Sequence, residues 1–280
     1  MLQGAPPGKD HGVRPTPALI LRRRVTQLDT ADPTAGTDAG LRHFTSVMTG
    51  WTEPEVTALA GGPAVLAPSE VEEADEMADG CLLLARLARD QECLVRGPLD
   101  RTRQHWIGTS PHELMPHRRP APDRERFTEP GGDSGPPSTK PFHLGLYTST
   151  ARRDGPGMWR MYLDLGSSLH PLPWQTWELP VTDLTADVLD IGGACDWAAF
   201  VGRYPLVRGD DVYPDWAKAA RDFAGVHMTL RAIVAAQGFR IPVADGLAAA
   251  PFWDIESVLW LRWCFSAPRL VEITQPDAGP

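Results

Sequence analysis

Residues 254–263 read DIESVLWLRW, in which two carboxylates lead into an apolar run that contains Trp260 and Trp263. A short apolar run rich in aromatic residues is typical of a buried strand, so the sequence predicts a strand over residues 258–265. Further strands are predicted over residues 144–148, 158–163, 177–181, 188–191 and 225–229. Helices are predicted over residues 196–204 and 214–223. This mixture predicts an α+β fold.

A helix is also predicted over residues 70–90. The segment begins after Ser69 with a run of acids, becomes apolar at helical spacing and carries its arginines late. That order of charges suits the helix dipole. The following residues 93–96 predict a short strand, because Gly97 and Pro98 would end it.

Proline and glycine divide the chain. Five prolines lie in the first 40 residues and seven lie in residues 116–141, whereas eight of the ten tryptophans follow residue 141. Segments of that composition bury too little surface to offset the entropy of ordering. We therefore predict a flexible N-terminal arm (1–40), a helical segment with the first strand of the core (41–115), a Pro/Gly-rich loop (116–141), a Trp-rich α+β core (142–273) and a tail (274–280).

The charge and hydropathy of the chain disfavour two classes of partner. The 280 residues include 36 acids and 27 basic residues, a net charge of -9, which repels nucleic acid and anionic lipid. No window approaches the roughly 20 apolar residues of a membrane span. The short apolar stretch near the start is followed by arginines, the wrong order for a signal peptide. These features predict a cytoplasmic protein that binds neither membrane nor nucleic acid.

The sequence lacks the spacings that define several common sites. The four cysteines are scattered, without a C-x-x-C pair or a histidine at metal-ligand spacing, so we expect reduced thiols and no metal. Phosphate-binding, dinucleotide-binding, zinc-protease and hydrolase motifs are all missing.

A weaker pattern in three parts remains. An arginine ends the predicted strand in CLVRGPLDR (residues 93–101), hydroxyl groups fill the strand GLYTST (residues 145–150), and Glu256 precedes the apolar strand in DIESVLWLRW. In this order and context the chain resembles the ADP-ribosyltransferase superfamily of the Arg, Ser-Thr-Ser, Glu type, and more loosely the NAD-consuming RES-domain proteins. The sequence differs from that pattern in reading T-S-T, and in placing Asp254 two residues before Glu256.

The resemblance implies a split β-sheet core with flanking helices and NAD as the substrate. Arg96 would hold NAD together with Thr148, Ser149 and Thr150, and Glu256 would activate the nicotinamide ribose. The chemistry of these groups agrees. A fixed carboxylate stabilises the oxocarbenium-like ribose formed when the glycosidic bond breaks, and a guanidinium matches a pyrophosphate.

Further residues complete the expected site. Ser149 would orient the Glu256 carboxylate, so these two residues are the predicted catalytic pair. Tyr147 and Trp253 would supply flat apolar walls for nicotinamide. His227, on a predicted buried strand, would contact a phosphate or relay a proton. The ADP-ribose acceptor would be water, phosphate, a protein or a small molecule.

Each of these residues also has a structural interpretation. Arg96 is then a surface ion-pair partner, residues 148–150 are a solvent-facing row of strand formers, and Glu256 points outward from an alternating strand. His227 is a core histidine with one hydrogen bond, and the tryptophans pack the core. Under that interpretation the chain is a non-catalytic protein-interaction or immunity protein.

Overall fold

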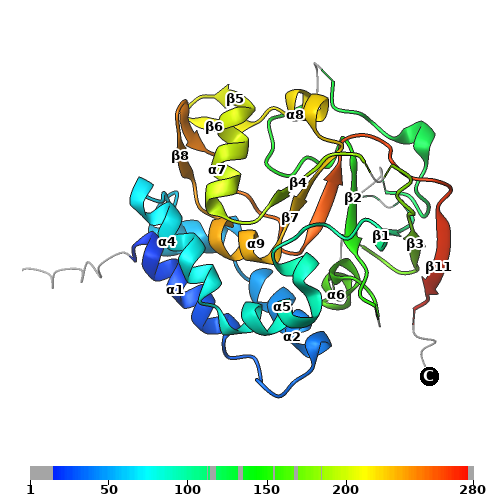
Figure 1. Ribbon diagram of the computed structural model, residues 1–280, viewed down its shortest axis with the longest axis horizontal. Coiled ribbons are helices and arrows are strands. Elements are labelled where there is room, and N and C mark those ends of the chain that lie inside the picture. The colour runs from blue at the N-terminus through cyan, green and yellow to red at the C-terminus, as the bar shows by residue number, and fades with distance from the viewer. Residues whose placement is uncertain are drawn as a thin grey trace, which may run out of the picture.

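The computed structural model describes residues 15–111, 113, 118–131, 135–153, 155–166, 170–183 and 185–276. Helices from the first third of the chain form a layer beside a large sheet, and a small sheet lies at the far end of that layer (Figure 1). The predicted α+β class is confirmed. The ADP-ribosyltransferase-like arrangement of the sheet stays a prediction.

The helical layer comes from the N-terminal third of the chain. Its helices are α1 (Pro17–Leu28), α2 (Thr37–Met48), α3 (Glu53–Ala60), α4 (Pro68–Asp79) and α5 (Leu82–Val95). Residues 1–14 of the predicted arm lie outside the described residues, and the prediction is wrong for the rest of it. Ile20, Leu21 and Leu28 are buried on one face of α1. Pro17 begins this helix. Proline suits the first position because an N–H group there would have no intrahelical partner.

The single helix predicted over residues 70–90 is two helices, α4 and α5. Asp29, at the end of α1, accepts hydrogen bonds from the Cys81 thiol and the Leu83 amide, and so caps the start of α5. The strand predicted over residues 93–96 is also wrong. These residues complete α5 and its C-cap, because Leu94 and Val95 pack into the core at helical spacing.

The large sheet has the strand order β11-β3-β1-β2-β10-β7-β4. The strands are β1 (Gln104–Gly108), β2 (Leu146–Thr150), β3 (Trp174–Glu178), β4 (Val188–Ile191), β7 (Gly225–Met228), β10 (Ser257–Trp260) and β11 (Arg269–Thr274). β4 and β7 are parallel, and the other neighbours are antiparallel. Every residue of β7 and β10 is buried, so both faces of the sheet are covered at its centre.

Five of the predicted strands are confirmed, β4 with the predicted ends and β2, β3, β7 and β10 with shifted ends. The strand predicted over residues 158–163 is wrong, because this segment is the helix α6 (Met158–Asp164). Met158 and Met161 are buried three residues apart on that helix. A short apolar run fits a strand or a helix equally well by periodicity alone, and packing decides between them.

The remaining strands form a small sheet with the order β5-β6-β9-β8. They are β5 (Pro205–Arg208), β6 (Asp211–Pro214), β8 (Ile241–Val243) and β9 (Gly246–Ala248), and α7 (Ala194–Arg203) packs against this sheet. The other helices of this region are α8 (Trp216–Asp222) and α9 (Leu230–Ala236). The helices α7 and α8 confirm the predictions over residues 196–204 and 214–223. The buried Arg24 of α1 donates to the carbonyls of Val234 and Gln237 at the end of α9, each at 2.7 Å.

The Pro/Gly-rich loop predicted over residues 116–141 contains no strand or α-helix in its described part, which holds the 3₁₀ turn η1 (Arg124–Arg126). Side chains from other elements hold this loop in place. The Trp177 and Trp216 indoles donate to the carbonyls of Pro120 and Ser138 at 2.7 and 2.8 Å. The loop therefore contributes walls to the cavities described below.

Candidate functional site

Glu256, which directly precedes β10, is fully buried at the centre of the large sheet. Its carboxylate accepts hydrogen bonds from the Ser149 hydroxyl at 2.9 Å, the Thr150 amide at 3.1 Å and the Thr150 hydroxyl at 2.8 Å. The structure therefore brings the T-S-T strand and the glutamate together, as the sequence predicted. Three donors to one carboxylate supply the pairing that a buried charge requires.

His227 on β7 lies between two carboxylates. Its Nδ1 is 2.6 Å from the Asp190 carboxylate on β4, and its Nε2 is 3.2 Å from the Glu256 carboxylate. Burial alone lowers the pKa of His227, but the hydrogen bonds and charges of Asp190 and Glu256 outweigh it and raise that pKa to about 9. The imidazole is therefore protonated at neutral pH.

The same network continues across the sheet to β1. Gln104 donates to the Thr150 hydroxyl at 3.0 Å and accepts from the Thr148 hydroxyl at 2.5 Å. The Trp260 indole donates to that Thr148 hydroxyl at 2.8 Å. The polar chain from Asp190 to Gln104 thus crosses five adjacent strands, β4, β7, β10, β2 and β1. This is the arrangement expected of groups that fix strand register.

The first turn of α6 covers this network. Gly157, the N-cap of α6, lies so close to β2 that a Cβ there would come within 2.8 Å of the Thr150 carbonyl and 3.3 Å of the Ser149 hydroxyl. Glu256 is 0% exposed and is not among the residues that line the two cavities described next. In this conformation its carboxylate is occupied by protein donors.

Arg96 does not reach this network. It is the C-cap of α5, and its side chain is 40% exposed beside Asp79 and Glu92, at 4.0 and 3.5 Å. This is the geometry of a surface ion pair. The resemblance placed Arg96 on NAD because the sequence predicted a strand at residues 93–96, and the helix found there turns the side chain to solvent.

A cavity of about 430 Å³ lies beside β2 and the segment that leads into β10. Its size falls within the range of about 300–1,000 Å³ typical of small-molecule sites. The walls are mainly aromatic, and the rings of Tyr147 and Trp253 meet edge to face with centroids 5.6 Å apart. The ring-bearing side chains that line it are Phe142, Tyr147, Trp159, Tyr162, His170, Phe252 and Trp253. We call it the large cavity.

Two cations line the large cavity. Lys140 donates to the Trp253 carbonyl at 3.0 Å, and its ammonium lies 5.8 and 5.9 Å from the ring centroids of Phe142 and Trp253. Arg118 donates to the His170 ring at 3.1 Å. Burial lowers the pKa of both cations, and the Asp254 charge partly offsets this for Lys140. Cations set among aromatic rings favour an anionic ligand with a flat apolar part.

The carboxylate at the large cavity belongs to Asp254. Its φ of 63° makes it the only non-glycine residue with positive φ in the part of the chain that the structure describes. Gln237 holds this conformation, because its side-chain oxygen accepts from the Asp254 amide at 2.9 Å and its amide group donates to the Asp254 carboxylate at 3.0 Å. Backbone strain that neighbouring groups maintain in this way concentrates at functional sites.

The Tyr147 hydroxyl is another polar group of a residue that lines the large cavity. It is buried and finds no hydrogen-bond partner among the described residues. Burial raises the pKa of Tyr147 well above its usual value, so the phenol keeps its proton and can donate it to a ligand.

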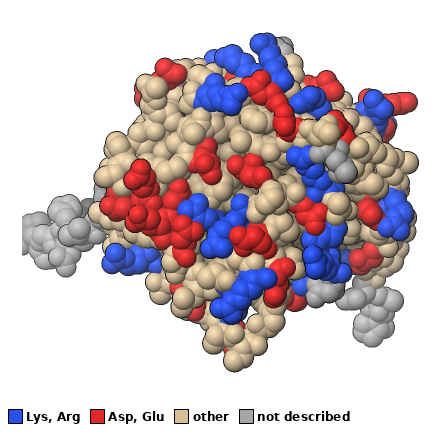
Figure 2. Space-filling model, viewed as in Figure 1, with Lys and Arg blue, Asp and Glu red and all other residues tan. Residues whose placement is uncertain are grey.

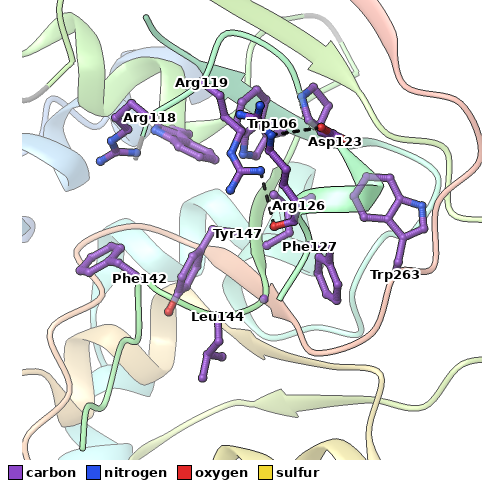
Figure 3. Close-up of a pocket in the computed structure, with 14 residues that line it drawn as sticks. Trp106, Arg118, Arg119, Asp123, Arg126, Phe127, Phe142, Leu144, Tyr147 and Trp263 are labelled. Atoms are coloured by element: carbon purple, nitrogen blue, oxygen red, sulfur yellow. Dashed lines mark hydrogen bonds and ion pairs between the residues drawn. The ribbon is translucent and has the colours of Figure 1, made fainter. Parts of the chain in front are cut away.

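A smaller cavity of about 100 Å³ adjoins the large one and shares Arg118, Phe142, Tyr147 and Trp159 with it. In Figure 3 the Arg119 guanidinium lies among the labelled side chains, between the Trp106 ring and Tyr147. Trp263 and Phe127 form one wall, with ring centroids 5.7 Å apart. We call it the small cavity.

The structure thus places Tyr147 and Trp253 at a cavity, as the sequence predicted, and places Ser149, Thr148, Thr150, His227 and Glu256 in the buried network behind it. Sequence reasoning missed Lys140, Arg118 and Arg119, because they lie in the Pro/Gly-rich loop. The sequence features that could have indicated a cationic site are the adjacent Arg118 and Arg119, and a lysine two residues before Phe142. His143, in the segment before β2, lines neither of the two cavities.

The surface charge is uneven. Acidic side chains gather over α4, whose acids are Glu70, Glu72, Glu73, Asp75, Glu76 and Asp79 (Figure 2). By contrast, the described lining of the small cavity holds three arginines and one carboxylate. A concentration of positive charge inside an acidic protein favours a small anion over a long polyanion.

The site and fold together define an α+β protein with an aromatic, cationic cavity beside a buried acid–imidazolium network. No protein-family model, curated protein or solved structure matches the chain. Among the described residues, none of the helices has the length and apolar character needed to cross a bilayer. A search of those same residues finds no cluster of three His, Cys, Asp or Glu side chains arranged for a metal ion.

Proposed function

We propose that the protein is an NAD-consuming enzyme that binds NAD in the large cavity, cleaves the nicotinamide glycosidic bond and transfers ADP-ribose to water or another acceptor. The observation that carries the proposal is the large cavity itself, with aromatic walls, Arg118 and Lys140 as cations, and Asp254 as a carboxylate in a strained backbone conformation.

The lining residues match the parts of NAD. The Tyr147 and Trp253 rings offer flat walls for nicotinamide. The guanidinium of Arg118 and the ammonium of Lys140 offer charge-assisted hydrogen bonds to the pyrophosphate oxygens. The Tyr147 hydroxyl offers a donor to a ribose or amide oxygen.

Asp254 is positioned for the chemical step. Cleavage breaks the bond between ribose C1′ and the nicotinamide nitrogen, and its electron pair leaves with nicotinamide. The positive charge that develops on the ribose is stabilised by the carboxylate of Asp254, which Gln237 holds in place. Water or another nucleophile then adds to C1′ and releases a proton.

This assignment differs from the sequence-based prediction, which gives the catalytic role to Glu256. Glu256 is sealed and fully hydrogen-bonded, whereas Asp254 lines the cavity. The buried network then supports the site indirectly, by holding β10 against β2 and β7.

We predict that Asp254→Asn lowers nicotinamide release by about 10²–10³-fold, the usual cost of one preorganised electrostatic group, and leaves NAD binding largely intact. Glu256→Gln removes a buried charge opposite His227 and should mainly lower stability. The measurement is nicotinamide release from NAD at equal folded concentration, with circular dichroism confirming the fold and thermal shift reporting binding.

Two results separate the alternatives. A loss of turnover in folded Glu256→Gln with an unchanged rate in Asp254→Asn returns the catalytic role to Glu256. No nicotinamide release and no thermal shift at millimolar NAD in the wild type contradicts the proposed function.

One observation favours the second candidate function, a protein-interaction module. β11 is an edge strand of the large sheet, and its Leu270, Val271 and Ile273 side chains are each more than 40% exposed. Edge strands with apolar side chains accept a strand from a partner. A wild type that fails the NAD experiments leaves this candidate as the one to pursue.

A further inference from the structure

We infer that the small cavity is a phosphate-monoester subsite, so that the preferred substrate is a dinucleotide phosphorylated on its adenosine ribose, of the NADP type. This inference rests on the proposed function, because it concerns the other end of the ligand held in the large cavity.

The two cavities together carry more cationic groups than one pyrophosphate requires. Arg118 and Lys140 at the large cavity would bind the pyrophosphate of a dinucleotide. Arg119 and Arg126 line the small cavity in addition, where the one carboxylate of the described lining is Asp123. The small cavity therefore holds more positive charge than a pyrophosphate needs, and that excess fits a second anionic group.

The arginines of the small cavity have donors to offer a phosphate. Arg119 uses one N–H group in a long hydrogen bond of 3.5 Å to the Arg126 carbonyl. The Arg126 Nε lies 3.6 Å from Asp123, and its side chain is 71% exposed. A guanidinium carries five N–H donors in a fork that matches phosphate oxygens. Both arginines line the small cavity, and their guanidinium groups carry further N–H donors that phosphate oxygens can accept from (Figure 3).

The small cavity has room for one terminal group of a ligand. A volume of about 100 Å³ lies far below that of a whole-ligand site, so the small cavity suits a terminal group of a larger molecule. Because the two cavities share Tyr147 and Arg118, one ligand can occupy both. In dinucleotide-binding α/β folds, an arginine accommodates the 2′-phosphate of NADP, so the same pairing of groups is chemically suited to this cavity.

The test compares calorimetric dissociation constants for NADP⁺ and NAD⁺ in wild type, Arg119→Gln, Arg126→Gln and Arg124→Gln. Arg124 is the matched control, since it lies in the same 3₁₀ turn as Arg126 and is absent from the small-cavity lining. We expect wild type and Arg124→Gln to bind NADP⁺ at least ~10-fold more tightly than NAD⁺, as one added charge-assisted contact provides. In Arg119→Gln and Arg126→Gln the ratio should fall to about one.

Equal binding of the two dinucleotides by wild type overturns the inference and leaves the proposed function standing. A preference for NADP⁺ that survives in the Arg119→Gln, Arg126→Gln double variant also overturns it. Binding of neither dinucleotide overturns the proposed function, and the inference falls with it.

Discussion

His227 shows how one buried residue combines the structural and the functional interpretation of the sequence. The histidine is in the core, yet it carries a charge shared between Asp190 and Glu256. Removing one member of such a buried group leaves an uncompensated charge, which costs about 3–5 kcal/mol. The residue therefore matters to folding whether or not a ligand ever meets it.

The raised pKa of His227 predicts how stability depends on pH. In the unfolded chain the imidazole titrates near its ordinary pKa of 6.5, and in the folded protein near about 9. Because the folded pKa is the higher one, the stabilisation is fully present below pH 6.5 and is lost as pH rises through 9. Its size is about 3 kcal/mol. Urea unfolding between pH 6 and pH 10 measures it.

The wild type itself provides the decisive comparison. A free energy of unfolding that stays constant between pH 6.5 and pH 9 contradicts a charged His227. The variant His227→Gln, where it folds, should show a flatter profile over the same interval.

Asp254 and Glu256 illustrate what the residue pattern left undecided. They are two residues apart, and the sequence singles out both. Glu256 matches the pattern of the resembled superfamily, whereas Asp254 differs from it. Which carboxylate meets the ligand depends on the positive φ of Asp254 and on the distant Gln237 that holds it. Neither the backbone angle nor that partner is visible in the local sequence.

At the scale of elements, the contact between α1 and α9 determines how the helical layer is joined to the rest. Arg24 satisfies two carbonyls at the end of α9 and stacks against Trp51 and Phe239, with its guanidinium 5.0 and 5.1 Å from their ring centroids. Helix termini need such partners, and cations are favoured there.

We predict that Arg24→Met destabilises the protein by about 2–5 kcal/mol, since it leaves two buried carbonyls without donors. Arg23→Met is the matched control, because Arg23 is the exposed neighbour on the same helix. Its effect should stay within about 0.5 kcal/mol. Urea unfolding at neutral pH measures both, and equal losses in the two variants contradict the role of Arg24.

The elements that the sequence misassigned share a cause. Residues 93–96 and 158–163 are short apolar runs whose local pattern permits a strand or a helix, and their burial against distant elements selects the helix. β1 and β11 were missed for the converse reason, since each becomes a strand by pairing with β3. The central strands β7 and β10 were predicted because each lies in a short, mostly apolar segment that is recognisable from the local sequence.

At the scale of the whole molecule, a cluster of buried side chains joins the helical layer to the large sheet. Leu84 of α5 and Leu259 of β10 both belong to it. The predicted segments 41–115 and 142–273 therefore share a core, which favours a single cooperative unfolding transition.

We predict that tryptophan fluorescence and far-ultraviolet circular dichroism report the same midpoint in urea. Most tryptophans lie after residue 141, whereas much of the helix lies before residue 96, so the two signals follow different parts of the chain. Two separated midpoints would show that the helical layer unfolds by itself.

The sequence predicted the class of the fold, the central strands and the meeting of Ser149, Thr150 and Glu256, because those features follow from local pattern and strand order. It did not predict the cavities. The walls of the large cavity combine the Pro/Gly-rich loop and β2 with the segment before β10, which lies more than 100 residues further along the chain. Tertiary packing brings these segments together. The loop has no helical or strand periodicity, so its place in the fold could not be predicted from its sequence.

The Arg24 contact also bears on how the chain is made on the ribosome. Arg24 and Val234 are 210 positions apart. At about 5–20 residues per second of synthesis, α1 emerges roughly 10–40 s before α9 exists to receive it. Throughout that interval the apolar face of α1 and the arginine beside it lack their native partner. The N-terminal helix therefore reaches its native packing only after synthesis has passed Val234, so its burial follows translation of most of the chain.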